Sequence, residues 1–219
     1  MKYGKELLQF LAELSENNNR EWFETNRNRY QDLRNSFTAT MENLHPLLIK
    51  FDKGLETINP KGAMFRINRD IRFSKDKSPY KNNFGSYFAE ENSHSELAGY
   101  YVHVQPKNCF VGGGIYMPDT NALKKIRQEI DYNSEEFLEI INETNFQKYF
   151  GTIHGEKLKN TPKDYEKTHP MSEYLKLKGF FVVANFTNEQ ICNNDFVAEM
   201  AVRFETMYPL NVFLNKAVK

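Results

Sequence analysis

The spacing of apolar residues changes along the chain, and this change constrains the fold most. Leucines within residues 7–14 recur at the 3.6-residue period of a helix, and a second helical stripe spans residues 22–44. From Ala63, apolar and polar residues instead alternate with the two-residue period of a strand, which we expect over residues 65–73. Pro46 is expected to end or kink the second helix. The chain is therefore predicted to begin with helices and to continue with strands.

The remaining sequence adds strands and further helices. Alternation and a turn within residues 100–111 predict a β-hairpin, and residues 180–186 are a candidate buried strand. A last helix is expected from Asp195 to Pro209, after other helices that follow the hairpin. These elements predict a single α+β domain over residues 1–219. Its mostly antiparallel sheet would contain the central hairpin and be packed by N-terminal and C-terminal helices.

Composition excludes several classes of protein. The 219 residues have a net charge of zero and a pI near 7, which argues against a dedicated binder of duplex nucleic acid. No apolar run exceeds five residues, so no membrane span is expected, and the N-terminus resembles neither a signal nor a transit peptide. Two cysteines, Cys109 and Cys192, make no disulfide framework and favour the cytoplasm.

One tenth of the chain carries a strong positive charge. Residues 61–81 hold seven basic and two acidic side chains, a net charge of +5 that the rest of the chain balances. On the expected strand Arg66, Asp70 and Arg72 share a face, and the planar fork of a guanidinium group matches a carboxylate or a phosphate. The same guanidinium groups repel metal ions, so we predict no metal. The segment therefore predicts a site for a small anionic ligand.

Each charged residue of this segment has an expected role. The arginines would hold the anion and the aspartates would orient them, whereas the lysines and the tyrosine would close over the ligand. The opposite charge of the arginines should lower the pKa of Asp70 and make it a poor proton donor. The candidate ligand-binding residues are Arg66, Arg69, Asp70, Arg72, Asp76, Lys77, Tyr80 and Lys81.

The segment also carries a resemblance. It reads Arg66-x-x-Arg69-Asp70-x-Arg72-Phe73-x-x-Asp76-Lys77-x-Pro79-Tyr80, and further blocks lie at residues 18–23, 99–106 and 112–116. Together these motifs resemble an uncharacterised bacterial family, a domain of unknown function, over nearly the whole chain. The resemblance implies that the basic segment is functional, but it implies no activity.

His103 is the candidate catalytic residue. It lies on the polar side of the expected hairpin with Tyr101 and Gln105, and its ordinary pKa near neutrality suits a proton-transfer group. The alternative is a structural histidine that is hydrogen-bonded within the sheet. Residues 112–114 are glycines that mark a bulge or a close backbone approach. Their spacing matches neither a dinucleotide-binding motif nor a phosphate-binding loop, and we predict no cofactor.

Three functions remain open from the sequence. The first is an enzyme or binding protein for a small anionic ligand. The second is an interaction module, because Phe65, Phe73 and Tyr80 interleave with basic residues in a way that can stack single-stranded nucleic acid, or that can bind a protein partner. The neutral total charge counts against nucleic acid. The third is a structural motif whose internal salt bridges hold the loop to the sheet. The oligomeric state is not predicted.

Overall fold

An antiparallel sheet forms the centre of the computed structural model, which describes residues 1, 3–90 and 96–219. The strands within these residues are β1 (Phe84–Phe88), β2 (Gly99–Val104), β3 (Cys109–Ile115) and β4 (Phe180–Phe186). They pair in the order β1-β2-β3-β4, every pair antiparallel. The expected α+β fold with a central hairpin, formed by β2 and β3, is confirmed.

Helices precede the sheet, interrupt it and follow it. The N-terminal ones are α1 (Gly4–Glu16), α2 (Arg20–Thr25), α3 (Arg27–Phe51) and the short 3-10 helix η1 (Lys53–Leu55). The later ones are α4 (Thr120–Tyr132), α5 (Ser134–Asn142), α6 (Thr144–Tyr149), α7 (Ser172–Leu175), α8 (Asn188–Cys192) and α9 (Phe196–Val218). Within the described residues, no helix combines the length and apolarity needed to cross a membrane.

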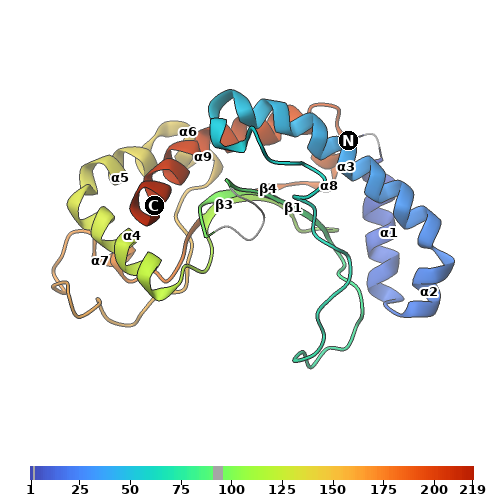
Figure 1. The fold of residues 1–219 in the computed structure, drawn as a ribbon, viewed down its shortest axis with the longest axis horizontal. Coiled ribbons are helices and arrows are strands. Elements are labelled where there is room, and N and C mark those ends of the chain that lie inside the picture. Colours follow the sequence, from blue (N-terminus) through green and yellow to red (C-terminus); the bar gives the residue numbers. More distant parts are fainter. Residues whose placement is uncertain (2, 91–95) are drawn as a thin grey trace.

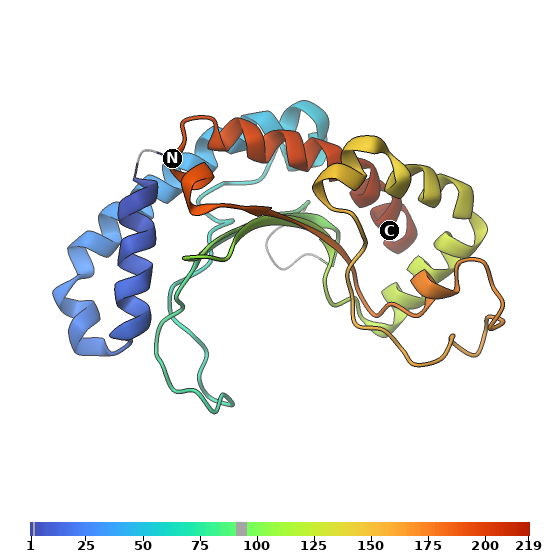
Figure 2. The same ribbon diagram turned by 180° about the vertical axis from the view of Figure 1, so that it is seen from behind.

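The sheet has one covered face and one open face. Figures 1 and 2 show α3 and α9 across the convex face, whereas no described helix crosses the concave face. On β2, Tyr100 and Val102 are buried, and the ring of Tyr100 meets Phe204 of α9 at 5.3 Å. Because strand side chains alternate, Tyr101 and His103 point to the concave face, where they are half-buried. The main core therefore lies beneath α3 and α9, and the concave face stays accessible.

Both long helices continue through a proline, so the expected end of the last helix at Pro209 is wrong, and of the two outcomes expected at Pro46 the end of the helix is excluded. Pro46 lies inside α3, and Pro209 lies inside α9. A proline leaves the carbonyl four residues earlier without its helical partner. Those carbonyls belong to Glu42 and Glu205, which lie with the prolines on exposed sides of their helices. Water can reach such positions, so neither proline ends its helix.

The expected strand over residues 65–73 is wrong. Residues 63–65 pair with the edge of β1, where the amide of Phe65 donates to the carbonyl of Gly85 at 3.0 Å. The chain then leaves the sheet as a loop, and the amide of Lys81 closes it by donating to the carbonyl of Ile67 at 2.7 Å. We call residues 61–83 the basic loop. It descends beside the concave face of the sheet (Figure 2).

Burial explains why the strand stops. Ile67 is 4% exposed and packs into the core, whereas Phe73, on the same side of the expected strand, is 96% exposed. No described strand or helix offers the tip of the loop an apolar surface, so the alternating pattern lacks a partner. The tip of the basic loop therefore projects from the fold.

Candidate functional site

Ion pairs occupy the tip of the basic loop. Arg69 pairs with Asp76, and Arg72 pairs with Asp70 at 2.6 Å. Hydrogen bonds from Arg72 hold the pKa of Asp70 below its ordinary value. The pKa of Asp76 is also lowered, first by hydrogen bonds from the hydroxyl and amide of Ser78 and then by one from Arg69. The aspartates thus contact the arginines that we expected them to orient, but each pair also offsets one positive charge within the loop.

Tyr80 fixes the base of the loop to the N-terminal helices. Its ring stacks on Phe23 of α2, with centroids 3.9 Å apart and planes 17° apart. The side-chain amide of Asn18 clamps its backbone, donating to the Tyr80 carbonyl at 2.9 Å and accepting from its amide at 3.1 Å. Tyr80 is buried, and Lys77 donates to the carbonyl of Ile71 at 3.0 Å. These contacts favour an anchoring role for Tyr80 and Lys77 over a role in covering a ligand. Their role in ligand binding stays a prediction.

Arg66 and Lys81 differ from the other basic candidates. Neither forms an ion pair with a carboxylate in the described part of the chain, and the Lys81 ammonium lies 5.2 Å from the ring centroid of Phe65. Lys81 is half-buried, and its burial, followed by the positive charge of Arg66, lowers its pKa. An anion bound near Lys81 would offset both the cost of burying its ammonium group and the repulsion from Arg66.

A polar pocket opens at Lys81. It measures about 450 Å³, and we call it the loop pocket. It is lined by Ser15, Asn18, Arg69, Asp76, Ser78, Tyr80, Lys81, Asn82 and Asn83. Two cations face one carboxylate here, and the remaining groups include amides and hydroxyls that can donate hydrogen bonds. The lining therefore has a net positive charge and neutral donors around it.

A second pocket lies on the concave face of the sheet. It measures about 560 Å³, and we call it the sheet pocket. It is lined by Phe65, Tyr87, Tyr101, His103, Asn108, Phe110, Gly112, Gly113, Gly114, Tyr116, Phe181, Val182 and Val183. The two pockets adjoin, because Lys81 lies over Phe65 and the amide of Asn83 is 3.4 Å from Nδ1 of His103.

Glycines form the floor of the sheet pocket for a structural reason. A Cβ atom on Gly112 would lie 2.7 Å from the carbonyl oxygen of Val182, and Gly114 has a φ of +104°. L-residues with side chains rarely adopt that φ. The pairing of β3 with β4 is residue for residue, so close approach explains these glycines and a bulge does not. They leave the centre of the concave face without side chains.

His103 is held at both ring nitrogens. Gln105 Oε1 lies 3.0 Å from Nε2, so Nε2 carries the proton, and Nδ1 accepts from the Tyr101 hydroxyl at 2.8 Å. The ring stacks on Phe110 with centroids 4.6 Å apart. Burial lowers the pKa of His103 and raises the pKa of Tyr101 to about 12. These contacts favour a neutral histidine that positions the Tyr101 hydroxyl, and a catalytic role for His103 stays a prediction.

The lowered pKa of His103 predicts a pH-dependent stability. Below a pH of about 6.5, its ordinary pKa, the unfolded chain binds a proton that the native histidine resists, so the free energy of unfolding falls as the pH falls. We expect the melting temperature to fall less between pH 7.5 and 5.5 in His103→Gln than in the parent. His154→Gln, at an exposed histidine, is the control and should keep the parent slope. Equal slopes in all three proteins would contradict this assignment.

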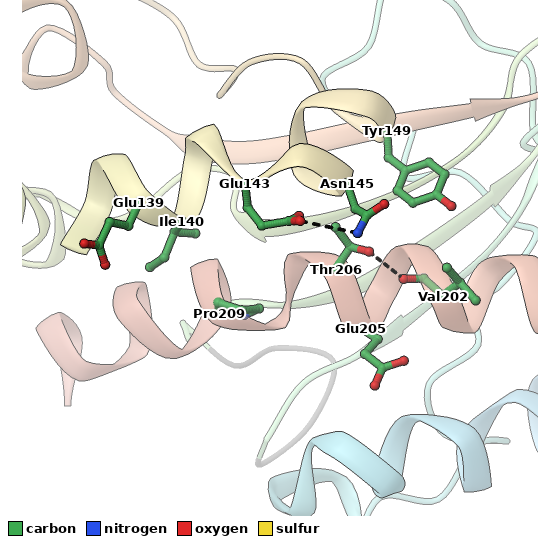
Figure 3. Close-up of a pocket in the computed structure, with 9 residues that line it drawn as sticks. All are labelled: Glu139, Ile140, Glu143, Asn145, Tyr149, Val202, Glu205, Thr206 and Pro209. Atoms are coloured by element: carbon green, nitrogen blue, oxygen red, sulfur yellow. Dashed lines mark hydrogen bonds between the residues drawn. The ribbon is translucent and has the colours of Figure 1, made fainter. Parts of the chain in front are cut away.

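A third pocket, of about 540 Å³, lies among α5, α6 and α9 (Figure 3). Glu139, Glu143 and Glu205 contribute carboxylates, and no lysine or arginine lines it. Glu143 caps α6 by accepting from the amide of Phe146 at 2.8 Å. Figure 3 also shows its bond with Asn145. Negative charge makes this pocket unsuitable for an anion.

The comparison with protein families agrees with the resemblance. A model of the conserved hypothetical protein family DUF2461 matches residues 6–213. The chain belongs to this family. Neither the curated proteins nor the solved structures that were compared gave a match. The range matched to DUF2461 includes the basic loop, its anchor on Phe23 and the adjoining pockets. The site therefore lies within the part of the chain that defines membership, and the resemblance seen in the sequence is confirmed.

Proposed function

We propose that this protein binds a small anionic ligand, carrying a phosphate or carboxylate group, in the loop pocket. One observation carries the proposal. Lys81 is half-buried without a carboxylate partner among the described residues, and its burial, followed by the positive charge of Arg66, lowers its pKa. A buried charge is costly unless it is paired, so this arrangement favours a partner from outside the chain.

The surrounding groups suit an anion with several oxygen atoms. Asn82 and Asn83 can donate from their side-chain amides, and Arg69 presents guanidinium hydrogens to the same pocket. Asp76 already accepts from Ser78 and from Arg69, so its negative charge is partly offset. An anion would meet cations and neutral donors from more than one direction, which favours a specific site over diffuse attraction.

The other functions receive different support. The exposed pairs Arg69–Asp76 and Arg72–Asp70 support a structural role for these four residues at the tip of the loop. Tyr101 lines the sheet pocket, and its hydroxyl donates to His103. In a catalytic site, Tyr101 would therefore be the proton donor and His103 the proton acceptor. Two free cysteines, buried Cys109 and exposed Cys192, support the proposal of a cytoplasmic protein.

Thermal denaturation in the presence of inorganic phosphate and of citrate tests the proposal. A ligand at 100 times its dissociation constant stabilises the native state by about 2.7 kcal/mol, which corresponds to several degrees for a protein of this size. We expect such a shift with at least one anion. Lys81→Gln should remove it, whereas Lys75→Gln, at an exposed lysine of the same loop, should retain it.

Two results would overturn the proposal. One is the absence of any anion-dependent shift in the parent protein. The other is an equal loss of the shift in Lys81→Gln and Lys75→Gln, because it would show that the charge of the whole loop, and not the loop pocket, attracts the anion.

A further inference from the structure

The sheet pocket contains a slot with aromatic ends. Its floor is the backbone at Gly112 and Gly114, which carry no side chain toward the concave face. Tyr101 pairs across the sheet with Gly112 and stands at one end, with Phe110 beside it at a centroid distance of 5.7 Å. Phe181 pairs with Gly114 from the opposite strand. We call this space, above the two glycines and between these rings, the aromatic slot.

Another ring extends the far end of the aromatic slot. Tyr116 follows β3, and its centroid lies 5.1 Å from that of Phe181 in an edge-to-face arrangement. Tyr116 is 67% exposed, so a ligand in the sheet pocket can reach its ring. Val183 forms one side of the slot. The aromatic rings surround a stretch of glycine backbone without side chains, and the space between them suits a planar, apolar group.

Charge lies on one side of this slot. Phe65 lines the sheet pocket, and the Lys81 ammonium lies over its ring, at the point where the loop pocket begins. Phe65 and Tyr101 are in contact, with centroids 6.0 Å apart. A ligand that fills both pockets must therefore join a planar apolar part to an anionic part. Asn108 adds an amide to the sheet pocket, which can meet polar atoms at the edge of a planar ring.

We propose that the ligand is a nucleotide, whose base enters the aromatic slot while its phosphate binds at Lys81. Heteroaromatic bases combine a flat face with hydrogen-bonding edges, and aromatic side chains bind them by stacking. A volume of about 560 Å³ falls within the range of pockets for small organic ligands. This inference rests on the proposed function, because it assigns the anion to the same loop pocket.

Calorimetric titration with three ligands tests the aromatic slot and the anion site separately. Adenosine 5′-monophosphate carries base and phosphate, ribose 5-phosphate lacks the base, and adenosine lacks the phosphate. We expect the monophosphate to bind at least about tenfold more tightly than either fragment. If ribose 5-phosphate binds as tightly as every nucleoside monophosphate tested, the aromatic slot is overturned and the anion site is left standing. Equal affinity for the monophosphate and adenosine would overturn the anion site instead.

Adenine represents only one pattern of hydrogen-bonding groups, so guanosine 5′-monophosphate, with a second purine, and uridine 5′-monophosphate, with a pyrimidine, are titrated as well. The inference requires at least one of the three to exceed ribose 5-phosphate by about tenfold. If none does, or if no nucleotide binds while citrate or phosphate still stabilises the protein, the nucleotide assignment fails and the anion site survives.

A substitution that fills the slot provides the second readout. Val183→Phe places a larger side chain beside Gly112 without altering the backbone. We expect it to lower the affinity for the best nucleotide at least about tenfold while leaving that for ribose 5-phosphate unchanged. Val202→Phe, at an exposed valine on α9, is the matched control and should bind as the parent does. Unchanged nucleotide affinity in Val183→Phe would contradict the slot.

The same base and phosphate occur in single-stranded nucleic acid, and one further titration distinguishes the two sources. An eight-nucleotide DNA strand should bind no more tightly than the free nucleotide if one nucleotide fills the site. A strand that binds at least about 100-fold more tightly, with an affinity that falls steeply with salt, would overturn the assignment of a free nucleotide in favour of a polymer.

Discussion

Phe23→Ala is expected to lower the free energy of unfolding by about 3–5 kcal/mol, the usual cost of removing a buried phenylalanine ring. Phe23 is 4% exposed, and its ring contacts both Tyr80 at 3.9 Å and Tyr30 at 5.0 Å. The substitution should also release the base of the basic loop, because the stack with Tyr80 holds it against α2. Chemical denaturation measures the first effect, and anion affinity under native conditions measures the second.

Tyr132→Ala is the matched control for this prediction. Tyr132 is a large aromatic residue, but it is 73% exposed at the end of α4, so its removal should change stability little. A loss of less than about 1 kcal/mol in Phe23→Ala would show that the ring does not anchor the loop. If folded Phe23→Ala is less stable than the parent but binds the anion equally well, the stack with Tyr80 contributes to stability and not to anion binding.

Charge reversal at Lys81 should have the largest effect on binding. Lys81→Glu places a carboxylate where the proposed anion binds and should lower the affinity for that anion at least about 100-fold, equivalent to about 2.7 kcal/mol. Because Arg66 lies nearby, the new carboxylate would find a cationic partner, and the fold should persist. Isothermal titration of the parent and the variant with the anion that stabilises best measures the change.

Lys75→Glu controls for long-range electrostatics in this experiment. Lys75 is exposed near the tip of the same loop, so its reversal alters the net charge by the same amount. Its effect should be less than about tenfold and should fade at high salt, because water and counterions screen exposed charges. Similar losses in the two variants would contradict a localised site at Lys81.

Local patterns predicted much of the fold. The spacing of Leu7, Leu11 and Leu14 correctly indicated α1, and the alternation on either side of the turn after Val104 indicated the central hairpin. Asp119 accepts from the amide of Ala122 at 2.7 Å and caps α4, which is a common role of aspartate at the start of a helix. Periodicity and capping are properties of adjacent residues, so one sequence can reveal them.

The failures arose where a distant surface decides the structure. Ile67 and Phe73 occupy equivalent places in the same alternating pattern, yet one is buried and the other projects into solvent. Pro46 and Pro209 did not end their helices, because both lie on exposed sides where the unpaired carbonyl can be hydrated. Neither outcome depends on neighbours in the sequence, so periodicity alone could not supply it.

The site was predicted only as a segment of high charge. That charge identified the basic loop, but it could not show which cations the aspartates of the loop would pair with. Arg69 and Asp76 meet across seven positions because the loop folds back on itself, and this leaves Lys81 as a half-buried cation of the loop without a carboxylate partner among the described residues. The anchor was also missed, because Asn18 and Tyr80 are 62 positions apart. The available signal was the resemblance to the family, which the sequence carries at both places.

A nuclear magnetic resonance titration with inorganic phosphate tests the anion site most directly. An anion bound in the loop pocket predicts saturable shifts of the backbone amide resonances of Lys81, Asn82 and Asn83, while those of Phe73 and Lys75 at the tip of the loop stay in place. It also predicts that Lys81→Gln abolishes these shifts. Shifts confined to the tip of the loop, or shifts that persist in Lys81→Gln, would contradict an anion site in the loop pocket.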